Sequence, residues 1–64
     1  MNYFETIEQL SYFFADCAKF WNGDAYKALD DVRNIDHDPF SPNGKRLDEE
    51  AKSDFIACIL EMLG

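Results

Sequence analysis

The sequence of 64 residues has few of the residues that form disulfides, bind metals or interrupt helices in very small proteins. It has two cysteines, one histidine, three glycines and two prolines, and 6 basic residues against 13 acidic ones. Two cysteines cannot build a disulfide framework, and no further ligands stand at the spacing of a zinc site. No run approaches the ~20 consecutive apolar residues of a membrane-spanning helix. We therefore expect no cofactor, no metal and no membrane.

Basic residues are also missing from the amino-terminal segment MNYFETIEQL, which carries glutamates where a secretory signal would be positive. Without an export signal, the expectation is a cytoplasmic protein with reduced thiols. The excess of acids gives a net charge of −7, which repels nucleic acid and anionic lipid. We therefore expect no direct binding of nucleic acid. The expected partner is another protein with a basic surface.

Apolar residues are plentiful: they make up 47% of the chain, and aromatic residues make up 16%, which is too rich for a disordered segment. A chain of this length forms one domain, so we expect a single folded unit over residues 1–64. Such a unit buries only about 60% of the surface that its unfolded chain exposes, and its stability is marginal. Good packing or oligomerisation must compensate.

The first stretch with helical spacing is predicted over residues 3–22. Apolar residues recur there three and four positions apart, as on one face of an amphipathic helix. They are Tyr3, Ile7, Leu10, Phe14, Cys17 and Trp21. Asn2 can cap the start, and the pair Asn22-Gly23 is a favourable stop because glycine adopts the left-handed conformation without steric cost.

Two further helices are predicted over 24–34 and 47–63. Asp24 can cap the shorter one, which must be stabilised by docking. The longer one has acidic residues in its first turn, where the helix dipole favours them, and an end that is apolar nearly all round. The predicted fold class is therefore all-α, a small three-helix bundle.

The segment 36–46 interrupts the helical pattern and is predicted to be a loop, with a type I turn at Ser41-Pro42-Asn43-Gly44. Asp36, His37 and Asp38 have metal-ligand side chains, and a metal-binding loop is one alternative. Neighbouring residues in an extended segment point in alternating directions, however, and the spacing departs from that of a calcium-binding loop. We expect instead that the aspartates bond to their own backbone and cap helix ends.

His37 is also the one candidate for a general base. Ser41 is close in sequence, but proline follows it and nothing predicts an oxyanion hole. A chain this short has little capacity to enclose the ~300 Å³ or more that ligand sites use. The expectation is that the protein is not an enzyme.

The acidic residues lie in two groups on either side of the predicted loop. They are Asp30, Asp31, Asp36 and Asp38, followed by Asp48, Glu49, Glu50 and Asp54. On a compact body these carboxylates could be spaced like backbone phosphates and occupy a groove built for nucleic acid. The leading hypothesis is a small inhibitor that masks a basic, nucleic-acid-handling protein. Phage-encoded anti-CRISPR and anti-restriction proteins have a similar size and charge.

A second hypothesis is a homodimeric or subunit protein, because the chain has more large apolar side chains than three short helices easily enclose. The residues expected to self-associate are Phe13, Phe20, Ile56, Ile59, Leu60 and Leu63. If the first and third helices are parallel, Cys17 and Cys58 lie at similar heights and could bridge under oxidation. The simpler expectation is that both are reduced core residues.

Overall fold

The computed structural model describes residues 1–41 and 43–64. It contains three helices, α1 (Tyr3–Phe20), α2 (Ala25–Asn34) and α3 (Glu49–Leu63). The prediction of an all-α, three-helix fold is thereby confirmed. Outside the helices, the described residues form one isolated antiparallel bridge.

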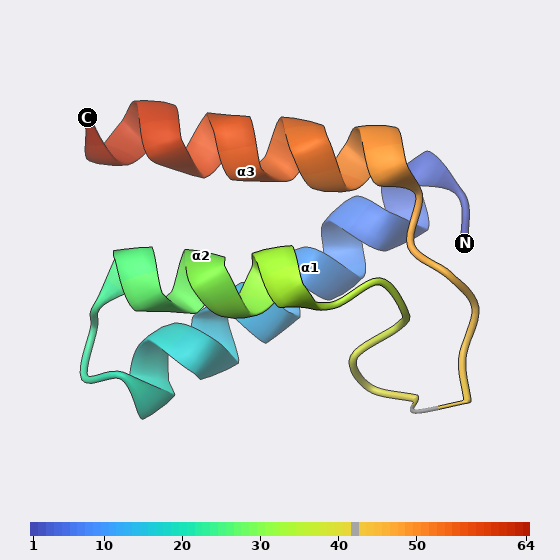
Figure 1. Cartoon of the computed structure of the whole chain (residues 1–64), viewed down its shortest axis with the longest axis horizontal. Coiled ribbons are helices and arrows are strands. Elements are labelled where there is room, and N and C mark those ends of the chain that lie inside the picture. Colours follow the sequence, from blue (N-terminus) through green and yellow to red (C-terminus); the bar gives the residue numbers. More distant parts are fainter. Residues whose placement is uncertain (42) are drawn as a thin grey trace.

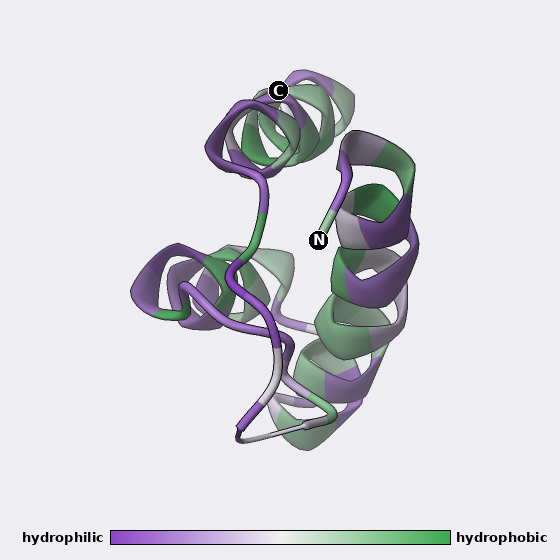
Figure 2. Ribbon diagram, turned by 90° about the vertical axis from the view of Figure 1, so that its right-hand side faces the viewer, coloured by the Kyte–Doolittle hydropathy of each residue, from purple (hydrophilic) through white to green (hydrophobic). Residues whose placement is uncertain are grey.

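The three helices are arranged so that α2 runs opposite to both of its neighbours (Figure 1). Helix α1 begins beside the start of α3 and then runs obliquely away from it, to end next to the start of α2. The connection between α2 and α3 lies at the opposite end of the molecule. Apolar positions of the helices turn toward one another, and hydrophilic positions lie on the outer sides of α1 and α2 (Figure 2).

Each helix starts at a side chain that accepts a hydrogen bond from its first turn. The caps are Asn2 on the Glu5 amide at 2.8 Å, Asp24 on Lys27 at 3.2 Å, and Asp48 on Ala51 at 2.9 Å. Such caps satisfy backbone N–H groups that have no partner within the helix. The third helix therefore begins at residue 49, two residues later than predicted.

The end of α1 is set by two residues in the left-handed region, Asn22 with φ 56° and Gly23 with φ 86°. The Gly23 amide turns back to the carbonyl of Ala18 at 2.7 Å, a bond typical of a glycine-terminated helix. Because this closure occupies residues 21–23, the helix ends at Phe20 rather than at 22 as predicted.

The core lies where all three helices meet the connection. Its buried apolar residues are Leu10, Ala28, Leu29, Val32, Leu47, Ala51 and Phe55. The Phe55 ring packs edge-on against Phe14, with the ring centroids 5.9 Å apart. Leu47 was predicted to open the third helix; it instead precedes the cap and packs into the core from an extended segment.

The connection between α2 and α3, residues 35–48, is a loop closed by backbone hydrogen bonds. The Asp38 amide donates to the Lys45 carbonyl at 3.0 Å, and the Leu47 amide donates to Asp36 at 2.9 Å. Gly44 donates to the Ser41 carbonyl at 2.7 Å, and a side chain at Gly44 would stand 2.8 Å from that oxygen. Residue 42 of the predicted type I turn lies outside the described residues.

Candidate functional site

The acidic residues of α2 contact neighbours within the chain. Asp30 pairs with Arg33 at 3.0 Å, one turn further along the same helix. Asp31 is half-buried and accepts a hydrogen bond from the Trp21 indole at 2.8 Å. That bond ties the end of α1 to α2. The predicted site residue Asp31 therefore has a structural role that sequence spacing did not reveal.

The two predicted aspartates of the loop also bond locally, and to different partners. Asp36 contacts the neighbouring His37 ring, and its second oxygen lies 3.5 Å from Arg46. The hydrogen bond with His37, followed by the charges of His37 and Arg46, lowers the pKa of Asp36. Asp38 accepts hydrogen bonds from Gln9 at 3.2 Å and from its own loop backbone.

Because Asp36 and Asp38 bond to different partners, they do not converge on a common point. Within residues 1–41 and 43–64, no group of three histidine, cysteine, aspartate or glutamate side chains could hold a metal ion. The expected backbone bond occurs at Asp38, which accepts from the Phe40 amide, whereas the helix caps are other residues. The remaining bonds of the loop aspartates fasten the connection to Gln9 of α1 and to Arg46.

The four acidic residues at the cap and in the first two turns of α3 differ in whether a basic side chain lies close to them. Asp48 is the helix cap, and its own amide donates to the buried Thr6 hydroxyl at 3.0 Å. Glu49 lies 3.8 Å from Arg46. Glu50 and Asp54 are exposed, and neither forms an ion pair with a described residue.

Asp54 has a neutral partner in the first turn of α1. The Tyr3 hydroxyl donates to its Oδ2 at 2.6 Å. This bond, followed by desolvation and then by the negative charges of Asp54, Glu50 and Asp48, raises the pKa of the Tyr3 phenol. Three carboxylates of α3 therefore all raise the pKa of one exposed hydroxyl, that of Tyr3 at the amino-terminal end of α1.

The positive charge closest in sequence to these acids, Lys52, is turned the other way. Its ammonium donates to backbone carbonyls at the end of α2, including that of Arg33 at 2.9 Å. Lys52 thereby caps α2, as a basic group at a helix carboxyl terminus does. This geometry leaves the Glu50 and Asp54 side of α3 with a net negative charge.

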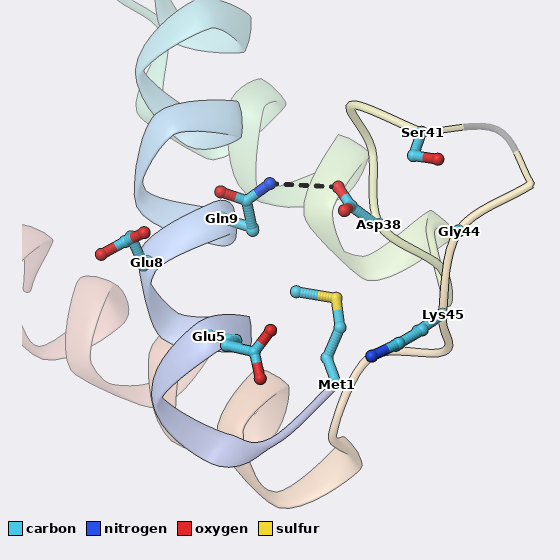
Figure 3. A pocket seen from close by; sticks show the side chains of 8 residues that line it. All are labelled: Met1, Glu5, Glu8, Gln9, Asp38, Ser41, Gly44 and Lys45. Atoms are coloured by element: carbon cyan, nitrogen blue, oxygen red, sulfur yellow. Dashed lines mark hydrogen bonds between the residues drawn. The ribbon is translucent and has the colours of Figure 1, made fainter.

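One pocket of about 350 Å³ lies between α1 and the loop (Figure 3). Figure 3 shows the Met1 side chain extending into it. A hydrogen bond joins Gln9 of α1 to Asp38 of the loop, and Lys45 lines the pocket from the loop. Charges of both signs line this pocket, and every buried side-chain polar atom among the described residues has a hydrogen-bond partner. We assign no ligand to it.

A second hollow, which we call the α1–α3 cleft, is mainly apolar and has a volume of about 330 Å³. It is lined by Tyr3, Phe4, Ile7, Asp54, Phe55 and Cys58. The Phe4 ring is 80% exposed, although it is large and apolar. The lining residues come from the first turns of α1 and the middle of α3. Sequence reasoning identified Asp54 as a candidate but missed the apolar part of this site, since Tyr3, Phe4 and Ile7 were not expected to bind a partner.

The residues predicted to self-associate fall into two groups. Phe13, Ile56 and Ile59 are half-buried and pack against the core, so their apolar surface is mostly used within the chain. The others face solvent: Phe20 is 75% exposed, and Leu60 and Leu63 are each 38% exposed. Met62, at 77%, adds to the exposed end of α3.

The two cysteines are free and lie in different surroundings. Cys58 is exposed in the α1–α3 cleft beside Ile7, whereas Cys17 is ten residues further along α1, about 15 Å by helical rise. Burial, followed by a hydrogen bond to Asp31, raises the pKa of Cys17 to about 11. The two thiols are therefore not neighbours, although α1 and α3 run in the same general direction (Figure 1).

Comparison with protein-family models, with curated proteins and with solved structures found no match to this chain. Across the part of the chain that the structure describes, none of the helices combines the length and apolar character needed to cross a membrane.

Proposed function

We propose that the chain is a protein-binding module that covers a basic surface of another protein. The observation that carries this proposal is the unneutralised pair Glu50 and Asp54 on α3, next to the cap Asp48. With a net charge of −7, the whole molecule adds a long-range attraction toward a positive partner.

The sharpest form of the proposal is an inhibitor that occupies a nucleic-acid groove. Carboxylates on a rigid helix can stand where phosphates would bind, and the lysines and arginines of such a groove are spaced to receive them. A protein that handles DNA or RNA is the class of partner that offers such a groove. Phage-encoded anti-CRISPR and anti-restriction proteins act on partners of this class, and their size and charge are similar.

The experiment is competition between this chain and a fluorescent DNA duplex for nucleic-acid-handling proteins, such as a Cas9-type nuclease and a restriction enzyme. We expect displacement of the duplex, and about tenfold weaker displacement by Glu50→Gln/Asp54→Asn. The matched control is Glu8→Gln/Asp16→Asn, which removes the same charge from α1 and should displace nearly as well as wild type.

Two results would overturn the proposal in this form. One is that the duplex stays bound to every protein tested, whatever the concentration of the chain. The other is that both double variants lose the same affinity, because net charge rather than the α3 acids would then control binding. Circular dichroism should show that all variants keep their helices.

A second candidate function, a homodimer, is favoured by the exposed end of α3. Leu60, Met62 and Leu63 present apolar side chains to solvent within one turn. If they form a seam, sedimentation will show a dimeric mass that Leu60→Glu abolishes. A monomer at all concentrations would remove this candidate.

A further inference from the structure

The α1–α3 cleft combines an apolar floor with an acidic edge. Phe55 forms the floor, and Phe4 and Ile7 form the wall on α1. Asp54 stands at the edge, with Oδ2 engaged by Tyr3 and with no hydrogen bond from a described residue to Oδ1. An exposed ring beside a half-open apolar hollow is typical of a surface that receives a side chain from a partner.

The acidic edge continues along α3 beyond the cleft. Glu50, Asp54 and Glu61 lie within about 40° of one another around the helix and span about 16 Å of its length. Cys58 lies between them in the cleft wall. None of the residues lining the cleft is basic. The cleft is therefore complementary to a segment that carries an apolar side chain flanked by cations.

A helix is the segment that presents this pattern most directly. Side chains three and four residues apart on a helix share one face, about 5–6 Å apart, as do Glu50 and Asp54 on α3. An amphipathic helix can thus place an apolar residue in the hollow and lysines or arginines against the edge. A second copy of this chain is a poor occupant, because it would bring its own carboxylates against the same edge.

We infer that the α1–α3 cleft binds a basic amphipathic helix of the partner protein, with an apolar anchor between Phe4 and Cys58 and cations against Glu50, Asp54 and Glu61. This inference rests on the proposed function and adds the place and the chemistry of contact. The acids supply attraction and orientation, while burial of the anchor supplies most of the affinity.

Cys58 allows a test at the cleft itself. The probe is a synthetic leucine–lysine peptide of ~14 residues, about four helical turns, with leucines at helical spacing. Binding should slow the reaction of Cys58 with a thiol reagent in the Cys17→Ser background. A peptide with glutamate in place of lysine, and a scrambled leucine–lysine peptide, should leave the reaction unchanged.

Single substitutions distinguish binding in the cleft from binding elsewhere on the surface. Phe4→Ala should weaken peptide binding about tenfold, because it removes the aromatic wall against which the partner's anchor packs. Phe20→Ala is the matched control, since it is the same substitution on the same helix at comparable exposure, 75% against 80%, and it should change nothing. Asp54→Asn should weaken binding less, while keeping an acceptor for Tyr3.

The possible failures are distinguishable. If the peptide binds by fluorescence anisotropy but Cys58 reacts at its free rate, the cleft assignment is wrong and the proposed function stands. If the peptide does not bind while the chain still displaces the DNA duplex, only the inference falls; if neither occurs, both are overturned. If Cys58 is protected without peptide and sedimentation shows a dimer that Phe4→Ala dissociates, a second copy occupies the cleft and the inference falls.

Discussion

The α1–α2 corner and the second half of α3 use their apolar residues in different ways. At the corner, Leu10, Leu29 and Val32 are completely buried, and the Trp21 ring is held by Asp31 and by the ammonium of Lys27, 5.0 Å from its centroid. In the second half of α3, Met62 remains 77% exposed. The corner stabilises the fold, whereas the end of α3 leaves apolar surface exposed to solvent.

The boundary between these regions falls at Phe55. Before it, polar bonds fasten α3 to both other helices, through Thr6 to α1 and through Lys52 to α2. Beyond it, only Ile56 and Ile59 pack against the core. A small domain has little stability in reserve, so surface apolar residues that do not stabilise it are candidates for binding.

The largest expected effect comes from truncating the corner. Leu29→Ala should destabilise the protein by about 2–5 kcal/mol, because the side chain is fully buried and leaves a cavity. Urea denaturation followed by circular dichroism measures this loss. Leu60→Ala, the same substitution on the exposed end of α3, should cost far less; equal losses would erase the distinction between the two regions.

A smaller loss of folding stability is expected from a substitution at the contact between α1 and the start of α3. Thr6→Val keeps the shape of the buried side chain but leaves the Asp48 amide without its acceptor, which should cost about 1–3 kcal/mol. Thr6→Ser retains the hydroxyl and should recover the part of the stability that the hydrogen bond supplies. A Thr6→Val protein as stable as wild type would show that this bond does not anchor α3.

Substitution at the exposed end should change stability least. Met62→Gln is expected to alter the free energy of unfolding by no more than about 0.5 kcal/mol, as at other surface positions. Amide hydrogen exchange should also be faster over the last turns of α3 than over α2. Strong protection of those amides in a monomer would mean that the end of α3 is as firmly packed as the corner.

The Tyr3–Asp54 bond predicts a pH dependence at the edge of the α1–α3 cleft. Because the folded pKa of Tyr3 is raised above its ordinary value near 10, the bond's contribution is complete below that pH. It is lost as pH rises through the folded pKa. In a Tyr12→Phe/Tyr26→Phe background, ultraviolet absorbance should show Tyr3 ionising at lower pH after Asp54→Asn; an unchanged titration would contradict the bond.

Local sequence signals predicted the helices well and the site only in part. The helix starts were marked by Asn2, Asp24 and the acidic residues before residue 51. A capping side chain bonds to a backbone amide only two or three residues further on, so its signal is local in the sequence. Trp21 was expected on the inner stripe but is 36% exposed, because α1 has already ended. Thr6 lies on the stripe between Tyr3 and Leu10, so helical spacing was the one signal that could have identified it.

The long-range pairs had no sequence signal. Tyr3 and Asp54 are 51 residues apart, and Gln9 and Asp38 are 29 apart. A list of acidic residues could not separate Asp31 and Asp38, which bond inside the fold, from Glu50, which remains unpaired among the described residues. That distinction depends on which helix lies opposite each carboxylate.

The sequence by itself determined three amphipathic helices, their caps and a strong negative charge, because these follow from spacing and composition within one or two turns. Only the tertiary structure decided where α1 diverges from α3, which apolar residues stay exposed, and which carboxylates lack a cation. The physical reason is that helix crossing is fixed by side-chain packing between distant segments, which no local pattern records.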